Sequence, residues 1–134
     1  MKRPNDNIND SDIASSLLSI VNEINDLCSL HEESANIMIM FAKELLSKLV
    51  QDNNDNITTT QVIANINEFI SGQLLKILLG DIERADSTAS FKIFVTTSVI
   101  GESNVHTMLM ITLNYLCYEI IQCSNNVAYE DGSG

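Results

Sequence analysis

The stretch FKIFVTTSVI at residues 91–100, followed by GESN at 101–104 and VHTMLMITLNYL at 105–116, decides the fold that the sequence predicts. Its first ten residues are rich in β-branched and aromatic side chains, which are typical of strands. A second apolar run begins after four residues, and two strands joined in this way form a hairpin. A third strand can follow at 117–123, and residues 127–129 can begin a fourth. We therefore expect a small antiparallel sheet.

Helical periodicity dominates the chain before this stretch. Apolar residues recur at steps of three and four over residues 12–30, 35–51 and 58–85, so each segment carries an apolar stripe. Gly72 and Gly80 lie inside the third segment and each costs about 1 kcal/mol relative to alanine, so we expect a close packing contact or a break at one of them. Helices followed by an antiparallel sheet predict an α+β fold, with the helices packed on the sheet.

Length and charge limit the classes of partner. The chain has 134 residues and a net charge of -11, from 18 acidic and 7 basic side chains. The bases are scattered, so we expect neither nucleic acid nor a membrane as a partner, whereas the field favours a segment that carries Lys or Arg. One domain is expected at 31–129, with an additional helix at 12–30 and flexible tails at 1–11 and 130–134.

The residues that commonly carry chemistry show no catalytic or metal-binding pattern. Cys28, Cys117 and Cys123 lack the paired spacing of a zinc site or a disulfide framework, which favours a reducing, cytoplasmic location. A glycine-rich phosphate loop, a nucleophile elbow and a zinc-binding His-Glu pattern are all absent from the sequence. We therefore expect no catalytic residue, no cofactor and no metal ion, and a protein that is not an enzyme.

Residues 91–107 resemble the Tctex-type dynein light chains. The match in residue type and spacing follows two helical segments in the order that this family has, and it includes Phe91, Lys92, Val95, Thr96, Ile100, His106 and Thr107. The resemblance covers about residues 35–126, and its specific part is residues 91–107. The chain departs from the family after Thr107, where Met108 to Asn114 replace the usual small residues and turn, and its C-terminal strands are short.

The resemblance implies a homodimer with exchanged strands and a non-catalytic adaptor of the microtubule motor. Such an adaptor binds extended segments of the dynein intermediate chain or of cargo by β-strand addition, because an open sheet edge offers unpaired N–H and C=O groups. It implies a cytoplasmic, cytoskeleton-associated protein of intracellular transport.

Two sets of residues follow from this interpretation. We expect the partner-binding edge strand to consist of Tyr118, Glu119, Ile120, Ile121, Gln122 and Cys123, with either alternate set facing the partner and Glu119 meeting a basic side chain. We expect the sheet and dimer core to contain Phe91, Ile93, Val95, His106, Thr107, Leu109 and Ile111. His106 is interpreted as a histidine hydrogen-bonded near the turn rather than as a ligand or base.

A second interpretation is a histone-fold-like subunit of a transcription complex. Residues 35–100 can form a short helix, a polar loop, a long central helix at 58–85 and a Thr-Thr-Ser cap at 96–98. Such a subunit pairs with another histone-fold chain and is almost purely helical, whereas the light-chain interpretation requires a sheet.

Overall fold

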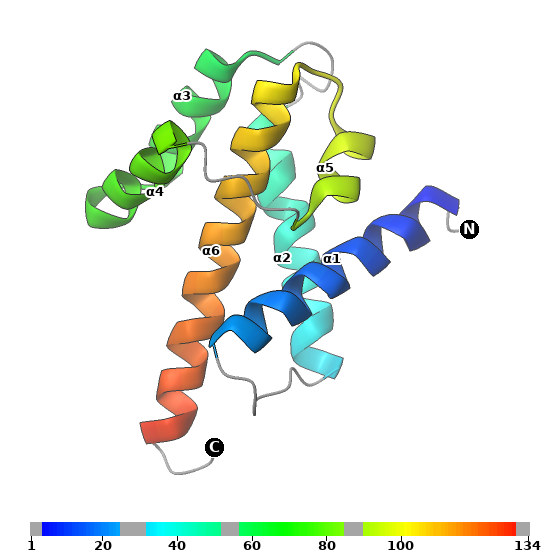
Figure 1. Ribbon diagram of the computed structural model, residues 1–134, viewed down its shortest axis with the longest axis vertical. Coiled ribbons are helices and arrows are strands. Elements are labelled where there is room, and N and C mark those ends of the chain that lie inside the picture. The colour runs from blue at the N-terminus through cyan, green and yellow to red at the C-terminus, as the bar shows by residue number, and fades with distance from the viewer. Residues whose placement is uncertain (1–3, 25–31, 52–56, 85–89, 131–134) are drawn as a thin grey trace.

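Helix α6, Ser103–Glu130, is the element around which the other helices are arranged (Figure 1). The computed structural model describes residues 4–24, 32–51, 57–84 and 90–130, and these residues contain six helices and no strand. The other five helices all pack against α6. They are α1 (Pro4–Ile24), α2 (Glu32–Val50), α3 (Thr59–Phe69), α4 (Gly72–Arg84) and α5 (Lys92–Ser98).

The prediction of an α+β fold with a strand-exchanged sheet is wrong, because the expected strands at 91–100, 105–116 and 117–123 lie largely in α5 and α6. Residues 108–113 are buried without interruption, so α6 is covered around its whole circumference. A helix that is apolar on all sides lacks the usual stripe and resembles a strand with two apolar faces. The β-branched composition of the segment therefore predicted the wrong conformation, because tertiary packing overrides a weak strand propensity.

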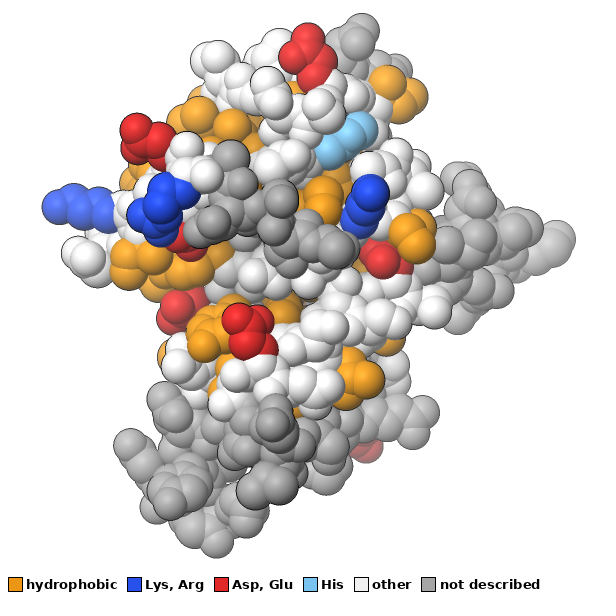
Figure 2. Space-filling model, viewed as in Figure 1, with side chains coloured by type: hydrophobic (Ala, Val, Ile, Leu, Met, Phe, Trp, Pro, Cys, Tyr) orange, Lys and Arg blue, Asp and Glu red, His pale blue; other side chains and the backbone are white. Residues whose placement is uncertain are grey.

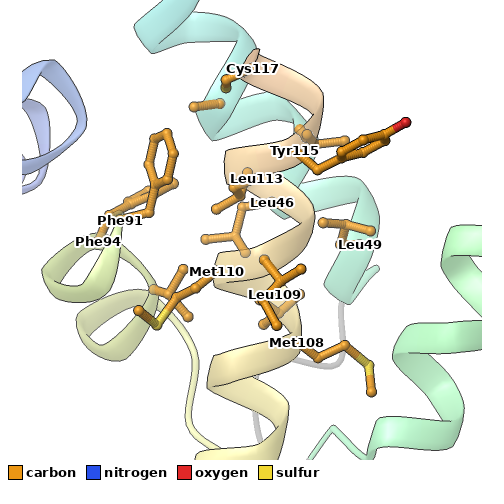
Figure 3. Close-up of a cluster of buried hydrophobic side chains, with 14 of the residues drawn as sticks. Leu46, Leu49, Phe91, Phe94, Met108, Leu109, Met110, Leu113, Tyr115 and Cys117 are labelled. Carbon is orange, nitrogen blue, oxygen red and sulfur yellow. The ribbon is translucent and has the colours of Figure 1, made fainter. Parts of the chain in front are cut away.

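The underlying helical period of α6 becomes visible once burial is known. Every fourth residue from 105 to 121 is buried: Val105, Leu109, Leu113, Cys117 and Ile121. Such residues lie along one side of a helix. Figure 3 shows the centre of this core, where α6 side chains meet Leu46 and Leu49 of α2. Phe94 of α5 and Phe91, which stands at the N-cap position of that helix, complete this cluster. The buried hydroxyl of Thr112 donates a 2.8 Å hydrogen bond to the carbonyl oxygen of Met108.

The start of α5 is capped by side chains of α1. Phe91 stands at the N-cap position in the left-handed region, at φ 64, and its own side chain is fully buried and caps nothing. Instead, the Phe91 amide donates to Ser16 Oγ at 2.7 Å and the Phe94 amide donates to Asp12 Oδ2 at 2.9 Å. These bonds satisfy two N–H groups that a helix leaves without internal partners. They also connect segments that are far apart in sequence.

The replacement Ser16→Ala tests this cap. It leaves the buried Phe91 N–H without an acceptor, and we expect the free energy of unfolding to fall by about 1–3 kcal/mol in urea denaturation. Ser15→Ala is the matched control, because Ser15 is exposed on the same helix and its loss should change stability by less than about 0.5 kcal/mol. Equal stability of the two variants would contradict the capping role.

The expected helix at 58–85 is divided into α3 and α4. It begins at Thr58, as the sequence predicts, with a capping box in which Thr58 and Gln61 satisfy each other's backbone amides. The predicted break falls at Gly72, whose φ of +70 favours glycine. Within the preceding helix, buried Asn65 donates from Nδ2 to the carbonyl oxygen of Leu49 at 2.6 Å and so joins α3 to the end of α2.

The N-terminal boundary also differs from the prediction. Residues 4–11, expected to be part of a flexible tail, form the first turns of α1, with Pro4 at its first position. Lys43 Nζ lies 2.5 Å from Asp10 Oδ1 and ties this end of α1 to α2. The expected helix at 12–30 is thus described as far as Ile24, and its remainder lies outside the described residues, as do residues 131–134 of the expected C-terminal tail.

Candidate functional site

Helix α4 is the least buried of the longer helices that pack against α6. Its fully buried side chain is Leu78, and Leu75 and Ile82 are half-buried against the core. Leu74 and Ile77 remain 44% and 43% exposed. Figure 2 shows hydrophobic, acidic and basic side chains close together at the left of the molecule, where Figure 1 places α4. Apolar side chains beside charges are a feature of surfaces that bind other proteins.

Tyr115 of α6 adds a buried polar group next to this helix. The residue is only 9% exposed, and its hydroxyl has no hydrogen-bond partner among the described residues. Figure 3 shows its ring extending from α6 on the side opposite Phe91 and Phe94. Burial, followed by the negative charges of Glu119 and Asp81, raises the pKa of Tyr115. The phenol therefore stays protonated at neutral pH and is a hydrogen-bonding group rather than a base.

The two carboxylates place negative charge around the tyrosine. Asp81 and Glu119 are both half-buried and come from α4 and α6. Leu74, Ile77 and Asp81 follow at steps of three and four, so they share one side of α4. Arg84 forms an ion pair with Asp81, and its side chain is 62% exposed, which limits the strength of that pair. We call Leu74, Ile77, Asp81, Tyr115 and Glu119 the α4–α6 face.

The partner-binding residues expected from the sequence do not share a face. Residues 118–123 are consecutive on α6, so their side chains point around the helix instead of alternating between two sides. Ile121 is buried, Tyr118, Glu119 and Gln122 are half-buried, and Ile120 and Cys123 are exposed. Of this set, Glu119 belongs to the α4–α6 face. The sequence pattern missed Tyr115 and Asp81, because their proximity depends on how α4 packs on α6.

The expected core residues have mixed outcomes. Four of them are buried, but in a helical core rather than a sheet: Phe91, Val95, Leu109 and Ile111. Ile93 is 45% exposed. It lies on the solvent side of α5, whereas Phe94 and Val95 of the same helix face the core. His106 and Thr107 are half-buried in the first turns of α6. The His106 Nε2 atom lies 2.8 Å from the carbonyl oxygen of Val99, so His106 holds the α5–α6 connection, near the turn as expected.

The two described cysteines differ in their surroundings. Cys117 is fully buried and Cys123 is exposed, and both are free thiols. Burial raises the pKa of Cys117 to about 12. Since the thiolate is the reactive form, Cys117 is an inert core residue at neutral pH.

Alkylation tests this difference. With iodoacetamide at pH 8, we expect Cys123 to be modified in the folded protein and Cys117 to remain unmodified, because burial excludes the reagent and suppresses the thiolate. Peptide mapping by mass spectrometry measures each site. In urea, the two cysteines should react at similar rates. Equal modification of Cys117 and Cys123 in the folded chain would contradict the assignment of Cys117 to the core.

The part of the chain that is described contains neither a metal site of protein ligands nor a membrane-spanning helix. No group of three or more His, Cys, Asp or Glu side chains could hold a metal ion there. Within the same ranges, no helix combines the length and apolar character needed to cross a membrane. Comparisons of the chain with protein-family models, curated proteins and solved structures return no match.

Proposed function

We propose that the chain is a non-catalytic helical binding module whose α4–α6 face holds a partner segment that carries Arg or Lys beside an apolar side chain. The observation that carries this proposal is the buried Tyr115 hydroxyl, which lacks a partner and lies in the field of Asp81 and Glu119. An unsatisfied buried polar group costs about 1–3 kcal/mol. Because less than 1 Å² of this atom is exposed, neighbouring side chains must shift before a ligand can hydrogen-bond to it, and that bond then relieves the cost.

The chemistry of the face favours a cationic ligand. Asp81 and Glu119 attract a positive charge, and the phenolic oxygen of Tyr115 can accept a hydrogen bond from a guanidinium or ammonium group. Leu74 and Ile77 supply apolar area, which contributes about 25 cal/mol for each Å² removed from water. The net charge of -11 also steers a basic segment toward the protein and speeds its association.

This proposal keeps part of the adaptor role that the light-chain resemblance implied. Both involve a non-catalytic protein that binds a segment of another protein. Addition of a β-strand, however, requires an open strand edge, and the described residues contain no strand. A helical surface takes its place. The dynein intermediate chain, a homodimer and a cytoskeletal location stay predictions that rest on the resemblance alone, and a cytoplasmic location stays a prediction that rests on the resemblance and on the cysteine pattern.

The second candidate function is that of a histone-fold-like module. It is favoured by the almost purely helical structure and by two successions of helices, α1–α2–α3 and α5–α6, the latter a short helix followed by a long one. The long helix is α6 and not the segment 58–85 that the sequence suggested. Helices α5 and α6 pack against α1, and α6 also packs against α2. In a histone-fold pair, a second chain packs against the first. Here α5 and α6 of the same chain pack against α1 and α2 in its place.

Peptide binding tests the α4–α6 face. We expect a short peptide with one arginine beside a leucine to bind the full chain, and the same peptide with glutamine for arginine to bind several-fold more weakly. Glu119→Gln and Tyr115→Phe should each weaken binding by about three- to tenfold, because each loses one charge or hydrogen-bonding group. Isothermal titration calorimetry measures the affinities.

The matched control is Glu83→Gln, which removes one carboxylate from an exposed position of α4 that is not part of the α4–α6 face. It should leave the affinity nearly unchanged. The unfolding free energies of Glu119→Gln and Glu83→Gln, measured in urea, should stay close to that of the parent chain. That of Tyr115→Phe should be higher by up to about 1–3 kcal/mol, because this variant removes the buried unsatisfied hydroxyl. Similar binding of the arginine and glutamine peptides, or equal losses for Glu119→Gln and Glu83→Gln, would refute the proposed face.

Cleavage of the folded chain tests whether α5 and α6 stay bound to the preceding helices as a second chain would. A specific protease site is inserted within residues 85–89, between α4 and α5, and the purified full chain is cut there. We expect the two fragments to coelute in size-exclusion chromatography and to separate only in denaturant, because α6 packs against every other helix. Separation of the fragments in native buffer would argue against a paired, histone-fold-like arrangement.

A further inference from the structure

The most exposed apolar side chains of α2 lie together on its solvent side. Ile37 is 65% exposed and Met40 is 70% exposed. They stand three residues apart, so they are neighbours on one side of the helix. The rest of α2 buries its apolar residues in the core, including Ala42, Leu45 and Leu49. The apolar pair is therefore additional to the stripe that folding requires, and no described residue covers it.

On the solvent side of α2, a charged residue follows the exposed apolar pair at each end. Glu33 lies four residues before Ile37, and Glu44 lies four residues after Met40; both carboxylates are exposed. Lys43, beside the stripe, is already paired with Asp10 of α1. Lys48 follows one turn beyond Glu44. The apolar pair is thus bounded on each side by an acidic residue, and we call Glu33, Ile37, Met40 and Glu44 the α2 stripe.

We infer that the α2 stripe binds an amphipathic helix of another protein that carries Lys or Arg one turn to either side of an apolar pair. Two helices pack through such rows of side chains. In an antiparallel arrangement, the partner's apolar pair meets Ile37 and Met40, and its two bases meet Glu33 and Glu44. This site lies on a different helix from the α4–α6 face and goes beyond the proposed function.

A second copy of the chain does not satisfy the same charges. A two-fold axis through the apolar pair would place Glu33 of one copy opposite Glu44 of the other, and a parallel arrangement would place each glutamate opposite itself. Like charges in these positions oppose association. The net charge of -11 on each chain adds to this repulsion. The stripe's chemistry therefore fits a basic partner helix better than self-association.

A peptide of defined pattern tests the inference on the full chain. The probe is an alanine-based helix of about 16 residues, long enough to form in water, with two leucines three residues apart and a lysine four residues outside each leucine. A second peptide has glutamate in place of lysine. We expect the lysine peptide to bind with chemical-shift changes at residues 33–44, and the glutamate peptide to bind about tenfold more weakly or not at all.

The variants separate this surface from the rest of the molecule. Ile37→Asp combined with Met40→Asp should weaken the lysine peptide about tenfold or more. Ile100→Asp is the matched control, because Ile100 is also 65% exposed but lies in the α5–α6 connection, and it should leave binding unchanged. Glu33→Lys combined with Glu44→Lys should reverse the preference toward the glutamate peptide. Circular dichroism checks that each variant stays helical.

Four outcomes would overturn the inference. They are equal binding of the two peptides, an equal loss for Ile100→Asp, shift changes confined to α4 and α6, and a dimer of the parent chain that Ile37→Asp dissolves in sedimentation experiments. Shift changes confined to α4 and α6 would leave the proposed α4–α6 face standing. The dimer would identify a second copy as the occupant of the α2 stripe.

Discussion

The burial of α6 on all sides is the constraint on which the rest of the structure depends. Residues 108–113 are buried without a gap, and one neighbouring helix can cover only one side of them. The other five helices all pack against α6, and together they remove this segment from water. Full burial of a large apolar side chain contributes about 1.5–3 kcal/mol. A helix with this composition is therefore stable only as the centre of a bundle.

The same constraint explains how α1 and α5 are held. Helix α5 has only seven residues, and an isolated helix of that length is unstable in water. Its first amides are satisfied by Ser16 and Asp12 of α1, while Phe91, Phe94 and Val95 are buried in the core. A contact between segments more than 70 residues apart in the chain thus supplies both the cap and the packing that the short helix lacks.

The two proposed binding surfaces consist of apolar residues that the helical bundle leaves exposed, together with the charges beside them. Helix α4 leaves Leu74 and Ile77 partly exposed beside Tyr115, and α2 leaves Ile37 and Met40 exposed between two glutamates. In both places carboxylates border the apolar side chains, with Arg84 paired to Asp81 on α4 and Lys48 one turn beyond Glu44 on α2. Part of the negative charge of the chain therefore lies at these two surfaces, where a basic segment can combine charge pairing with apolar contact.

The amino-acid sequence by itself determined the helices with a clear amphipathic period and the start of the third segment at residue 58, because these depend on local spacing. It also predicted a break or a close packing contact at Gly72 or Gly80, because glycine is unfavourable within a helix. Only the tertiary structure decided that residues 92–98 and 103–123 are helical. Their β-branched composition and continuous apolar character suit a buried strand as well as a buried helix, and the choice depends on what covers them. The proximity of Tyr115, Glu119 and Asp81 was likewise decided by packing, since it joins residues of two helices that no periodic pattern relates.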